Sequence, residues 1–491
     1  MSPRQLPIDL LCPDVLDNIG YMTGSSVRQS TLFFTPLAAQ MSLIKDDLLE
    51  PIDVLLNDKD LVDLVRARLA ARHPRSSRTG RRSIAPDRLL RCCVLKHLKG
   101  WSFRELEREV RSNLAYRLFT HFDGDPTPDF STFSRTFALL GTETTQAIHA
   151  RIVAMAHAER IAPGRRLRTD TTVVETNIHH PTDSTLLADG ARVLTRSLKR
   201  FAEECKAGVL KVVDHGRAVQ RRVLEIHRAA RSIRETGRER LQVSYSKLVG
   251  LVQGVVRQAT SVLQKQASGR LPIVGARLRA LQAQLQLEHF LPLVRQVLLQ
   301  TNQRVFGGDV HVQGKILSLF EEHTQVVRKG KAHKPTEFGR LVRIDEVENG
   351  IVSQYAVLPG NHSDANSWVP ALESHEKHFG RAPRLATADR GYFSARNEQE
   401  AKARGVVRVA LPARGPLSKM RAALQRQRWF RRALKWRGAI EPRIGTLKNQ
   451  FSMARALYKS DKGFERFVGW CVIAQNVVSM ARTLVRRRGT R

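Results

Sequence analysis

The fold is decided by the stretch Leu341-Val-Arg-Ile-Asp-Glu-Val-Glu-Asn-Gly-Ile-Val-Ser-Gln-Tyr-Ala-Val357. Both of its ends are rich in the β-branched residues that favour strands. The pair Asn349-Gly350 between them is typical of a tight hairpin turn, because these two residue types tolerate the positive φ angles that such turns need. The stretch therefore predicts two antiparallel strands joined by a short turn.

Segments on both sides of this hairpin predict an α/β fold. Upstream, the β-branched run at 165–176 predicts a strand, and a long helical region separates it from the hairpin. Downstream we expect a helix from about Ala365 to Phe379, a buried strand that ends at Asp389, a helix from Ser394 to about Arg404, and a strand from Val406 to Leu411. This order of elements predicts a mixed sheet with helices packed against it.

The long helical region between the first strand and the hairpin is expected to be an insertion at 184–304. Leu194, Leu198, Phe201 and Cys205 follow one another at spacings of 4, 3 and 4, and a second run from Leu248 to Val262 has the same heptad spacing. Each run is short, so a helical hairpin is the simpler prediction than a long coiled coil. Such a hairpin can pack within the chain or against a second copy.

Residues 58–160 are expected to form a helical domain of helix-turn-helix character, preceded by an extension at 1–57. One predicted helix runs from Phe103 to about Leu118, with Ser102 as its N-cap and Glu105 in the capping-box position. Its side chains Arg104, Arg108 and Arg111 lie on one side of the helix. Two interpretations stay open for these arginines, which are contact with DNA and an ordinary solvated helix face.

The charge of the chain favours a polyanionic partner. Its 82 Lys and Arg against 46 Asp and Glu give a formal net charge of +36, which points first to nucleic acid and second to an anionic membrane surface. The last 80 residues, 412–491, hold 20 basic and 3 acidic residues, and they end in a basic tail at 481–491. The most apolar stretch, Phe467 to Leu484, is interrupted by polar residues and is expected to be a buried helix, so we expect no membrane span and a cytoplasmic protein.

Three carboxylates from separate elements are candidates for a metal site. Asp170 lies within the first predicted strand, Asp389 follows a later strand, and Glu441 is one of the few acidic residues of the basic C-terminal region. Carboxylates that converge beside a basic surface are suited to two Mg²⁺ ions about 4 Å apart, which act on a phosphodiester. The residues alone leave plainer alternatives open, namely a strand-end aspartate, a turn aspartate and a salt bridge from Glu441 to Arg437.

Three motifs, in the right order, resemble the signatures of bacterial DDE insertion-sequence transposases. Arg437-Gly-Ala-Ile-Glu-Pro-Arg-Ile-Gly-Thr-Leu-Lys448 is similar to their R-x₃-E-x₆-K signature, and Ala388-Asp-Arg-Gly-Tyr-Phe393 to the signature around the second aspartate. The segment from Leu167 to Ser184 resembles the first signature, most closely that of the ISNCY group, and the basic segment at 328–339 is similar to that group as well. The resemblance spans about 58–480 and implies an RNase H-like catalytic domain at 165–480, behind a helical DNA-binding domain.

The resemblance also implies roles for single residues. Asp170, Asp389 and Glu441 fall on the DDE metal ligands, and Arg437 and Lys448 fall on positions that contact DNA near the cleaved phosphate. Further DNA contacts are expected from the basic residues Arg443, Arg390, Lys329, Lys331 and Lys334. The chain departs from the fuller signature because Leu434 stands where that signature has a Tyr, and Trp429 and Trp436 are the nearby aromatic candidates.

The resulting expectation is a transposase that binds terminal inverted repeats and, with two Mg²⁺ ions or with Mn²⁺ in their place, cleaves DNA and joins it to a target. The family implies a homodimer on DNA, in the cytoplasm of a bacterium and associated with its nucleoid. Two alternatives remain at this stage. An RNase H-like nuclease would cut without joining, and a non-enzymatic DNA-binding protein would tolerate replacement of Asp170 by Asn.

Overall fold

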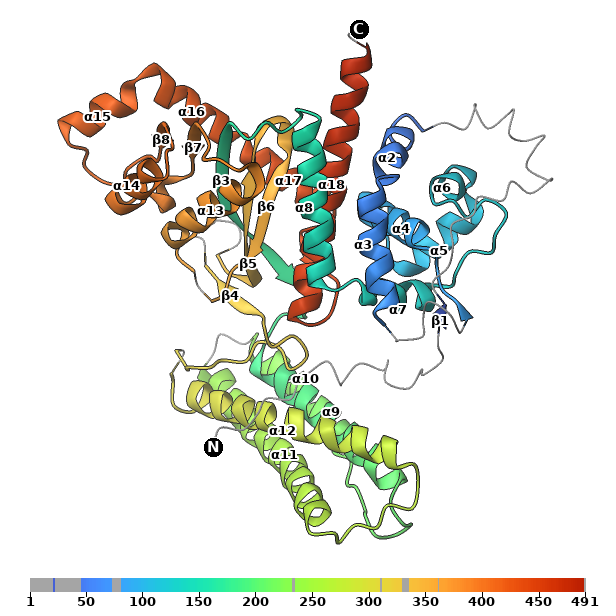
Figure 1. Cartoon of the computed structure of the whole chain (residues 1–491). Helices are drawn as coiled ribbons and strands as arrows, with labels where there is room; N and C mark the ends of the chain where they lie inside the picture. The colour runs from blue at the N-terminus through green and yellow to red at the C-terminus, as the bar shows by residue number, and fades with distance from the viewer. Residues whose placement is uncertain are drawn as a thin grey trace. The chain divides into compact units, whose positions relative to one another are not determined.

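The computed structural model describes residues 21–22, 46–72, 81–231, 235–309, 311–328, 335–360 and 362–489. The chain divides into two compact units, and Figure 1 shows the elements of each. The insertion unit consists of the helices within Ile178–Thr324, and the sheet unit consists of Asn18–Asn177 together with Gln325–Arg491. Each unit has its own hydrophobic core.

The sheet unit is built around a mixed sheet of seven strands. The strands are β3 (Arg166–Thr176), β4 (Gln325–Val327), β5 (Glu337–Glu346), β6 (Val352–Val357), β7 (Leu385–Thr387), β8 (Arg408–Ala410) and β9 (Arg455–Ala456). A separate short pair joins β1 (Tyr21–Met22) and β2 (Arg81–Arg82). The longest strand, β3, is central, and most of its residues are buried.

The pairing pattern changes direction at β3. On one side β3 pairs antiparallel with β5, which pairs antiparallel with β6 and β4. On the other side β3 pairs parallel with β7, and β7 pairs parallel with β8. The short β9 pairs parallel with the last two residues of β3. The expected mixed α/β sheet is therefore confirmed.

The predicted hairpin connects β5 to β6, and its turn has the expected backbone. Asn349 and Gly350 have φ angles of 56° and 74°. The side chain of Asn349 also donates to the backbone oxygen of Ile161, so the turn is tied to the segment that leads into β3. The predicted turn at Asn349-Gly350 is thus confirmed.

Helices at both ends of the chain complete the sheet unit. Before the sheet come α2 (Leu49–Leu56), α3 (Lys59–Ala70), α4 (Pro86–Lys99), α5 (Phe103–Ser112), α6 (Leu114–Phe119), α7 (Phe130–Leu139) and α8 (Thr142–Ala158). After β6 come α13 (Trp368–Phe379), α14 (Ala395–Ala403), α15 (Lys419–Arg426), α16 (Arg428–Gly438), α17 (Ile440–Asn449) and α18 (Asp461–Gly489). The N-terminal helices and the sheet share one continuous core.

One predicted helix is two helices in the structure. The prediction ran from Phe103 to about Leu118, but α5 ends at Ser112 and α6 begins at Leu114. Asn113 has an extended backbone, and its side chain accepts a hydrogen bond from the amide of Tyr116. Asn favours such caps over helix interiors, which explains the break. The capping box of Ser102 and Glu105 is present as predicted.

The C-terminal helix α18 is long and apolar enough to cross a membrane by length and composition, and it is the one helix with these properties among the described residues. Within its apolar stretch, 72% of the residues are buried inside the structure. It packs on α2, α4 and α8 as well as on β6 and β9. Its apolar residues are thus accounted for by the core of the sheet unit, as expected from the sequence.

Where the structure describes it, the insertion unit contains the helices α9 (Asp183–Glu203), α10 (Gly216–Ala229), α11 (Glu235–Ala267) and α12 (Arg277–Val305). Both heptad runs lie in its core. Leu194, Leu198 and Phe201 are buried on α9, and the run from Leu248 to Val262 is buried on α11. The helices pack against one another within this unit, and α9 packs on each of the other three.

Candidate active site

Two of the three predicted metal ligands lie at matching positions on neighbouring strands. Arg168 of β3 lies opposite Thr387, the last residue of the parallel strand β7. The paired residues end there, and Asp170 and Asp389 each come two residues later in their chain segments. Because register partners in a parallel pair point to the same face of the sheet, both aspartates lie at the edge where β7 ends.

A third aspartate, Asp364, reaches the same edge. Its Oδ1 accepts a hydrogen bond of 2.7 Å from the hydroxyl of Thr171, the neighbour of Asp170. Asp389 accepts a hydrogen bond of 2.7 Å from the amide of Gly391. A Cβ atom at position 391 would lie 2.8 Å from Asp364 Oδ2 and 2.9 Å from Asp389 Oδ1, so only glycine lets these two carboxylates approach each other here.

The pKa values of two buried groups near these aspartates, Tyr392 and Asp345, are raised. Burial raises the pKa of the Tyr392 hydroxyl, and the charges of Asp364, Asp170 and Asp345 raise it further. Burial also raises the pKa of Asp345, although Arg343 and the hydroxyl of Thr169 act against this shift. The charges of Asp170 and Asp364 thus act on Tyr392, while Asp345 is buried and paired with Arg343.

Glu441 lies on a helix that packs against the same strand. The helices α16 and α17 meet at Ala439, and α17 packs on β3. Pro442 lies in the first turn of α17, where proline is tolerated, so it does not kink the helix. The carboxylate of Glu441 is 65% exposed and forms an ion pair of 3.2 Å with Arg437.

The three predicted ligands are therefore not drawn together around one point. Among the described residues, no cluster of three or more acidic, histidine or cysteine side chains has the geometry of a metal site. Their chemistry nevertheless fits a hard divalent cation, because such ions prefer the carboxylate oxygens that Asp170, Asp389 and Glu441 supply. Glu441 would have to leave Arg437 to join them.

A buried carboxylate connects the strand of Asp170 to the helix of Glu441. Glu346 of β5 is fully buried, and its oxygens accept hydrogen bonds of 3.0 and 2.5 Å from the guanidinium of Arg168. The same side chain lies 3.4 Å from Nε of Arg443 on α17. Arg168 also donates to the backbone oxygen of Trp436 at the end of α16. These contacts fix α16 and α17 against the face of β3 that bears Asp170.

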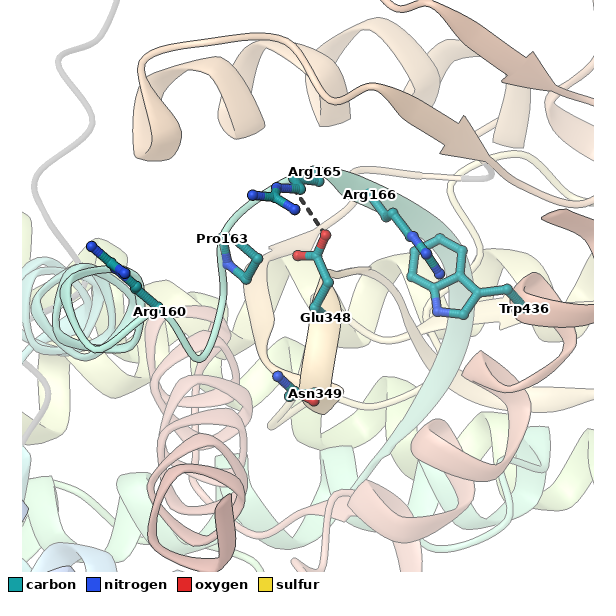
Figure 2. Close-up of a pocket in the computed structure, with 7 residues that line it drawn as sticks. All are labelled: Arg160, Pro163, Arg165, Arg166, Glu348, Asn349 and Trp436. Atoms are coloured by element: carbon teal, nitrogen blue, oxygen red, sulfur yellow. Dashed lines mark hydrogen bonds between the residues drawn. The ribbon is translucent and has the colours of Figure 1, made fainter. Parts of the chain in front are cut away.

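An open pocket of about 410 Å³ includes Trp436, whose backbone oxygen Arg168 contacts. Figure 2 shows the residues that line it. It is lined by Arg160, Pro163, Arg165, Arg166, Glu348, Asn349 and Trp436. The guanidinium of Arg166 faces the ring of Trp436 at 6.0 Å, and that of Arg168 lies 4.7 Å from the same ring. The carboxylate of Glu348 accepts hydrogen bonds from the backbone amides of Gly164 and Arg165. The pocket thus combines guanidinium groups with the aromatic ring of Trp436. This residue directly precedes the signature residue Arg437 in the sequence.

Two segments of the chain match known protein families. Residues 38–139 match the model of a family described as a transposase domain, DUF772, and residues 329–477 match that of a family described as a transposase DDE domain. The chain belongs to the DDE transposases of insertion sequences. It is therefore an enzyme of metal-dependent DNA cleavage and strand transfer. No curated protein and no solved structure matches the chain significantly.

The matched segments of the transposase include Asp389, Glu441, Arg437 and Lys448. They do not include Asp170, whose strand lies between the two matches. For Asp170 the argument rests on the register of β3 with β7 and on the resemblance of its own segment.

The other DNA contacts predicted for the transposase have different surroundings. Arg390 is exposed beside Asp389, and Lys448 is half-buried on α17. Arg443 points toward Glu346. On α5, Arg108 and Arg111 are exposed but pair with Glu109 and Glu107, and Arg104 lies over the ring of Phe130. Lys329, Lys331 and Lys334 lie outside the described residues.

Several residues of this site were not identified from the sequence. Asp364 had a detectable signal, since it follows the hairpin directly and precedes a predicted helix. Arg165 and Arg166 form a dibasic pair at the start of β3, which also could have been noticed. Glu346 gave no signal, because an acidic residue in a strand looks the same whether it is solvated or paired.

Proposed function

We propose that the transposase binds the terminal inverted repeats of its element and joins them to target DNA at a site made of Asp170, Asp389 and Glu441. The observation that carries this proposal is the parallel pairing of β3 with β7, in which Asp170 and Asp389 each follow the last paired residues by two positions. Supporting it, α17 packs on β3 and bears Glu441. The three residues come from three elements of one sheet unit.

The catalytic fold is proposed to be RNase H-like. The support is the strand arrangement, in which β6, β5 and β3 are antiparallel and β7 and β8 continue the sheet in parallel. The chain crosses from β3 to β5 through the insertion unit, which leaves this core arrangement intact. We infer further that the helices at 58–160 recognise the ends of the element, and that the element belongs to an ISNCY-like group.

Asp170, Asp389 and Glu441 are the groups that we propose hold two Mg²⁺ ions, with Mn²⁺ as a possible substitute. When bound, the ions would supply an activated water or 3′-hydroxyl and neutralise charge on the reacting phosphate. Arg437 has a second task in this proposal. While DNA is absent it pairs with Glu441, and this exposed pair contributes little to stability. A phosphate that takes over the guanidinium would leave Glu441 able to turn toward Asp170 and Asp389.

The proposed DNA contacts divide into two groups. Arg437, Lys448 and Arg390 are assigned to the strand that is cut, together with Arg165 and Arg166 of the pocket in Figure 2. Their guanidinium and ammonium groups can bind phosphate oxygens directly.

The second group is on the N-terminal helices and near the hairpin. Arg104, Arg108 and Arg111 are assigned to the DNA of the element's end, because exposed ion pairs with Glu107 and Glu109 exchange easily for phosphate contacts. Lys329, Lys331 and Lys334 remain proposed backbone contacts. For Arg443 the contact with Glu346 favours a role in fixing α17 over direct binding to DNA.

We also propose that two copies act together on DNA, since two ends must be brought to one target. The protein is proposed to act in the bacterial cytoplasm, associated with the nucleoid. Light scattering with and without DNA that carries the element's ends tests whether two copies act together. A complex with a single copy per pair of ends would contradict it.

The proposed function is tested by cleavage and joining of a labelled duplex that carries the inverted repeat, in the presence of Mg²⁺. Asp170→Asn and Asp389→Asn are expected to abolish both products while DNA binding persists. Glu175→Gln is the matched control, because this carboxylate of β3 pairs with Arg455 instead. Cleavage without joining by the wild type would favour a nuclease. Full activity of Asp389→Asn would refute the proposed site.

A further inference from the structure

The insertion unit carries a row of arginines on α10 that has no part in the site described above. Arg217, Arg221 and Arg228 lie on this helix, and Arg231 lies in the turn two residues after its end. Their spacings of four, seven and three residues put them on one side of the helix, together with the exposed Leu224. The opposite side of α10, formed by Val219, Val223 and Ile226, is buried in the core of the unit.

Among the residues that the structure describes, these four arginines have no acidic partner. Arg222 on the flank of α10 pairs with Glu225. Within the part of the chain that the structure describes, none of the four arginines of the row makes an ion pair, and all four are exposed. A solvated helix face of ordinary composition would mix both signs of charge, whereas this face of α10 has one sign only.

We propose that this row binds the phosphate backbone of duplex DNA, so that the insertion unit is a second DNA-binding surface of the transposase. From Arg217 to Arg231 the helix advances by about 21 Å at 1.5 Å per residue. Duplex DNA carries a phosphate on each strand every 3.4 Å of its axis, so about 21 Å is the length of six base pairs. Guanidinium groups spaced along one side can therefore meet separate phosphates of the same duplex.

The neighbouring helix α9 adds to the same kind of surface. Its exposed positions Arg192, Arg196 and Lys199 follow one another at helical spacing. Lys199 pairs with Asp214, which directly precedes α10, so the exposed side of α9 adjoins the start of α10. Basic groups thus continue from one helix to the next. No base-specific contact is implied, because arginines that meet phosphates position DNA without reading its sequence.

The inference rests on the proposed action on DNA, but its test does not require cleavage. The full chain with Arg217, Arg221, Arg228 and Arg231 all replaced by Gln is compared with wild type for binding to a duplex of random sequence, measured by fluorescence anisotropy from 50 to 300 mM salt. Each lost phosphate contact lowers the slope of log K against log salt concentration by about 0.9. Loss of all four contacts lowers the slope by up to about 3.6.

The matched control removes the same charge elsewhere in the insertion unit. Lys265, Arg270, Arg277 and Arg279 are exposed around the connection from α11 to α12, and replacing all four by Gln is expected to leave the slope within about one of wild type. An equal loss of slope in both variants would overturn the proposal, because net charge alone would then explain it.

Two further measurements on the same variants separate the alternatives. An unchanged slope in the α10 variant, with wild-type circular dichroism and Tm, would refute the DNA contact. If that variant keeps the slope but is monomeric where wild type is a dimer by light scattering, the row is instead a surface between copies, which also overturns the proposal. A further outcome is a wild type that binds DNA but shows no cleavage activity. If the α10 variant then still lowers the salt slope by the expected amount, the arginine row is supported and the proposed catalytic site is refuted.

Discussion

Replacing Glu346 by Gln tests whether one buried carboxylate positions the catalytic helix against the catalytic strand. Glu346 is fully buried between Arg168 of β3 and Arg443 of α17. Arg168 is itself almost completely buried. Removing the charge therefore leaves a buried guanidinium without its counterion, which costs 3–5 kcal/mol in comparable buried pairs, as an order of magnitude.

Because Gln keeps one oxygen that can accept from Arg168, we expect the low end of this range, about 3 kcal/mol. For a unit of this size that corresponds to a fall in Tm of roughly 4–5 °C. The functional effect should exceed the loss of stability. A displacement of α17 by about 1 Å would move Glu441 and Arg437 away from Asp170 and lower the cleavage rate about 100-fold.

The assay compares the cleavage rate at saturating DNA with the dissociation constant for the same duplex, at a temperature where both proteins are folded. A positioning role predicts a lower rate with DNA affinity within a few-fold of wild type. Asp53→Asn is the matched control, because Asp53 pairs with the buried Arg91 on the N-terminal helices. If Asp53→Asn, at equal folded fraction, lowers the rate as much as Glu346→Gln, the reasoning about Glu346 is refuted.

Three other predictions follow from the surroundings of single residues. Gly391→Ala should lower the cleavage rate about 100-fold with little change in Tm, because the added methyl would displace Asp364 or Asp389. Gly141→Ala is the control, since nothing lies within 4 Å of a Cβ at that position. Equal cleavage rates of the two variants would contradict the crowding at Gly391. Burial lowers the pKa of Lys96 to about 8, so its charge opposes folding below that pH and the penalty fades as pH rises toward 10.5. Lys96→Met should therefore raise stability at pH 7 by about 1–3 kcal/mol, with the gain in Tm vanishing near pH 10.5; a constant gain would contradict the titration. Burial acts to lower the pKa of His121, but hydrogen bonds to Asp53 and Asp87 outweigh it and raise that pKa, so its stabilisation is complete below the unfolded pKa of about 6.5 and is lost as pH rises through the folded value. The Tm advantage of wild type over His121→Asn, which keeps a residue suited to the positive φ here, should shrink between pH 6.5 and 8.5, and an advantage that grew instead would contradict this sign.

Local signals in the sequence predicted much of the sheet and its turns. The Asn349-Gly350 turn and the capping box of Ser102 and Glu105 depend on neighbouring residues alone, and both are present. The break at Asn113 could not be placed from periodicity, because a single capping side chain interrupts an otherwise continuous helical pattern.

The candidate site was harder to predict, because it depends on which strands become neighbours. Asp170 and Asp389 could be proposed as partners only through a resemblance, and the pairing of β3 with β7 supplies the physical reason. Glu346 and Asp364 acquire their roles through contacts 178 and 193 residues away, with Arg168 and Thr171. The pairing of Glu441 with Arg437 was one of the open alternatives, and the structure contains it.

The position of α18 has a consequence for how the protein is made. This helix comes last in the chain, yet α2, α4 and α8, which come first, pack on it. Nascent chains fold as their segments emerge, and here α2, α4 and α8 emerge well before the helix that covers part of their apolar surface. A chain that lacks α18 would therefore expose the apolar side chains of α2, α4 and α8 to aggregation and proteolysis.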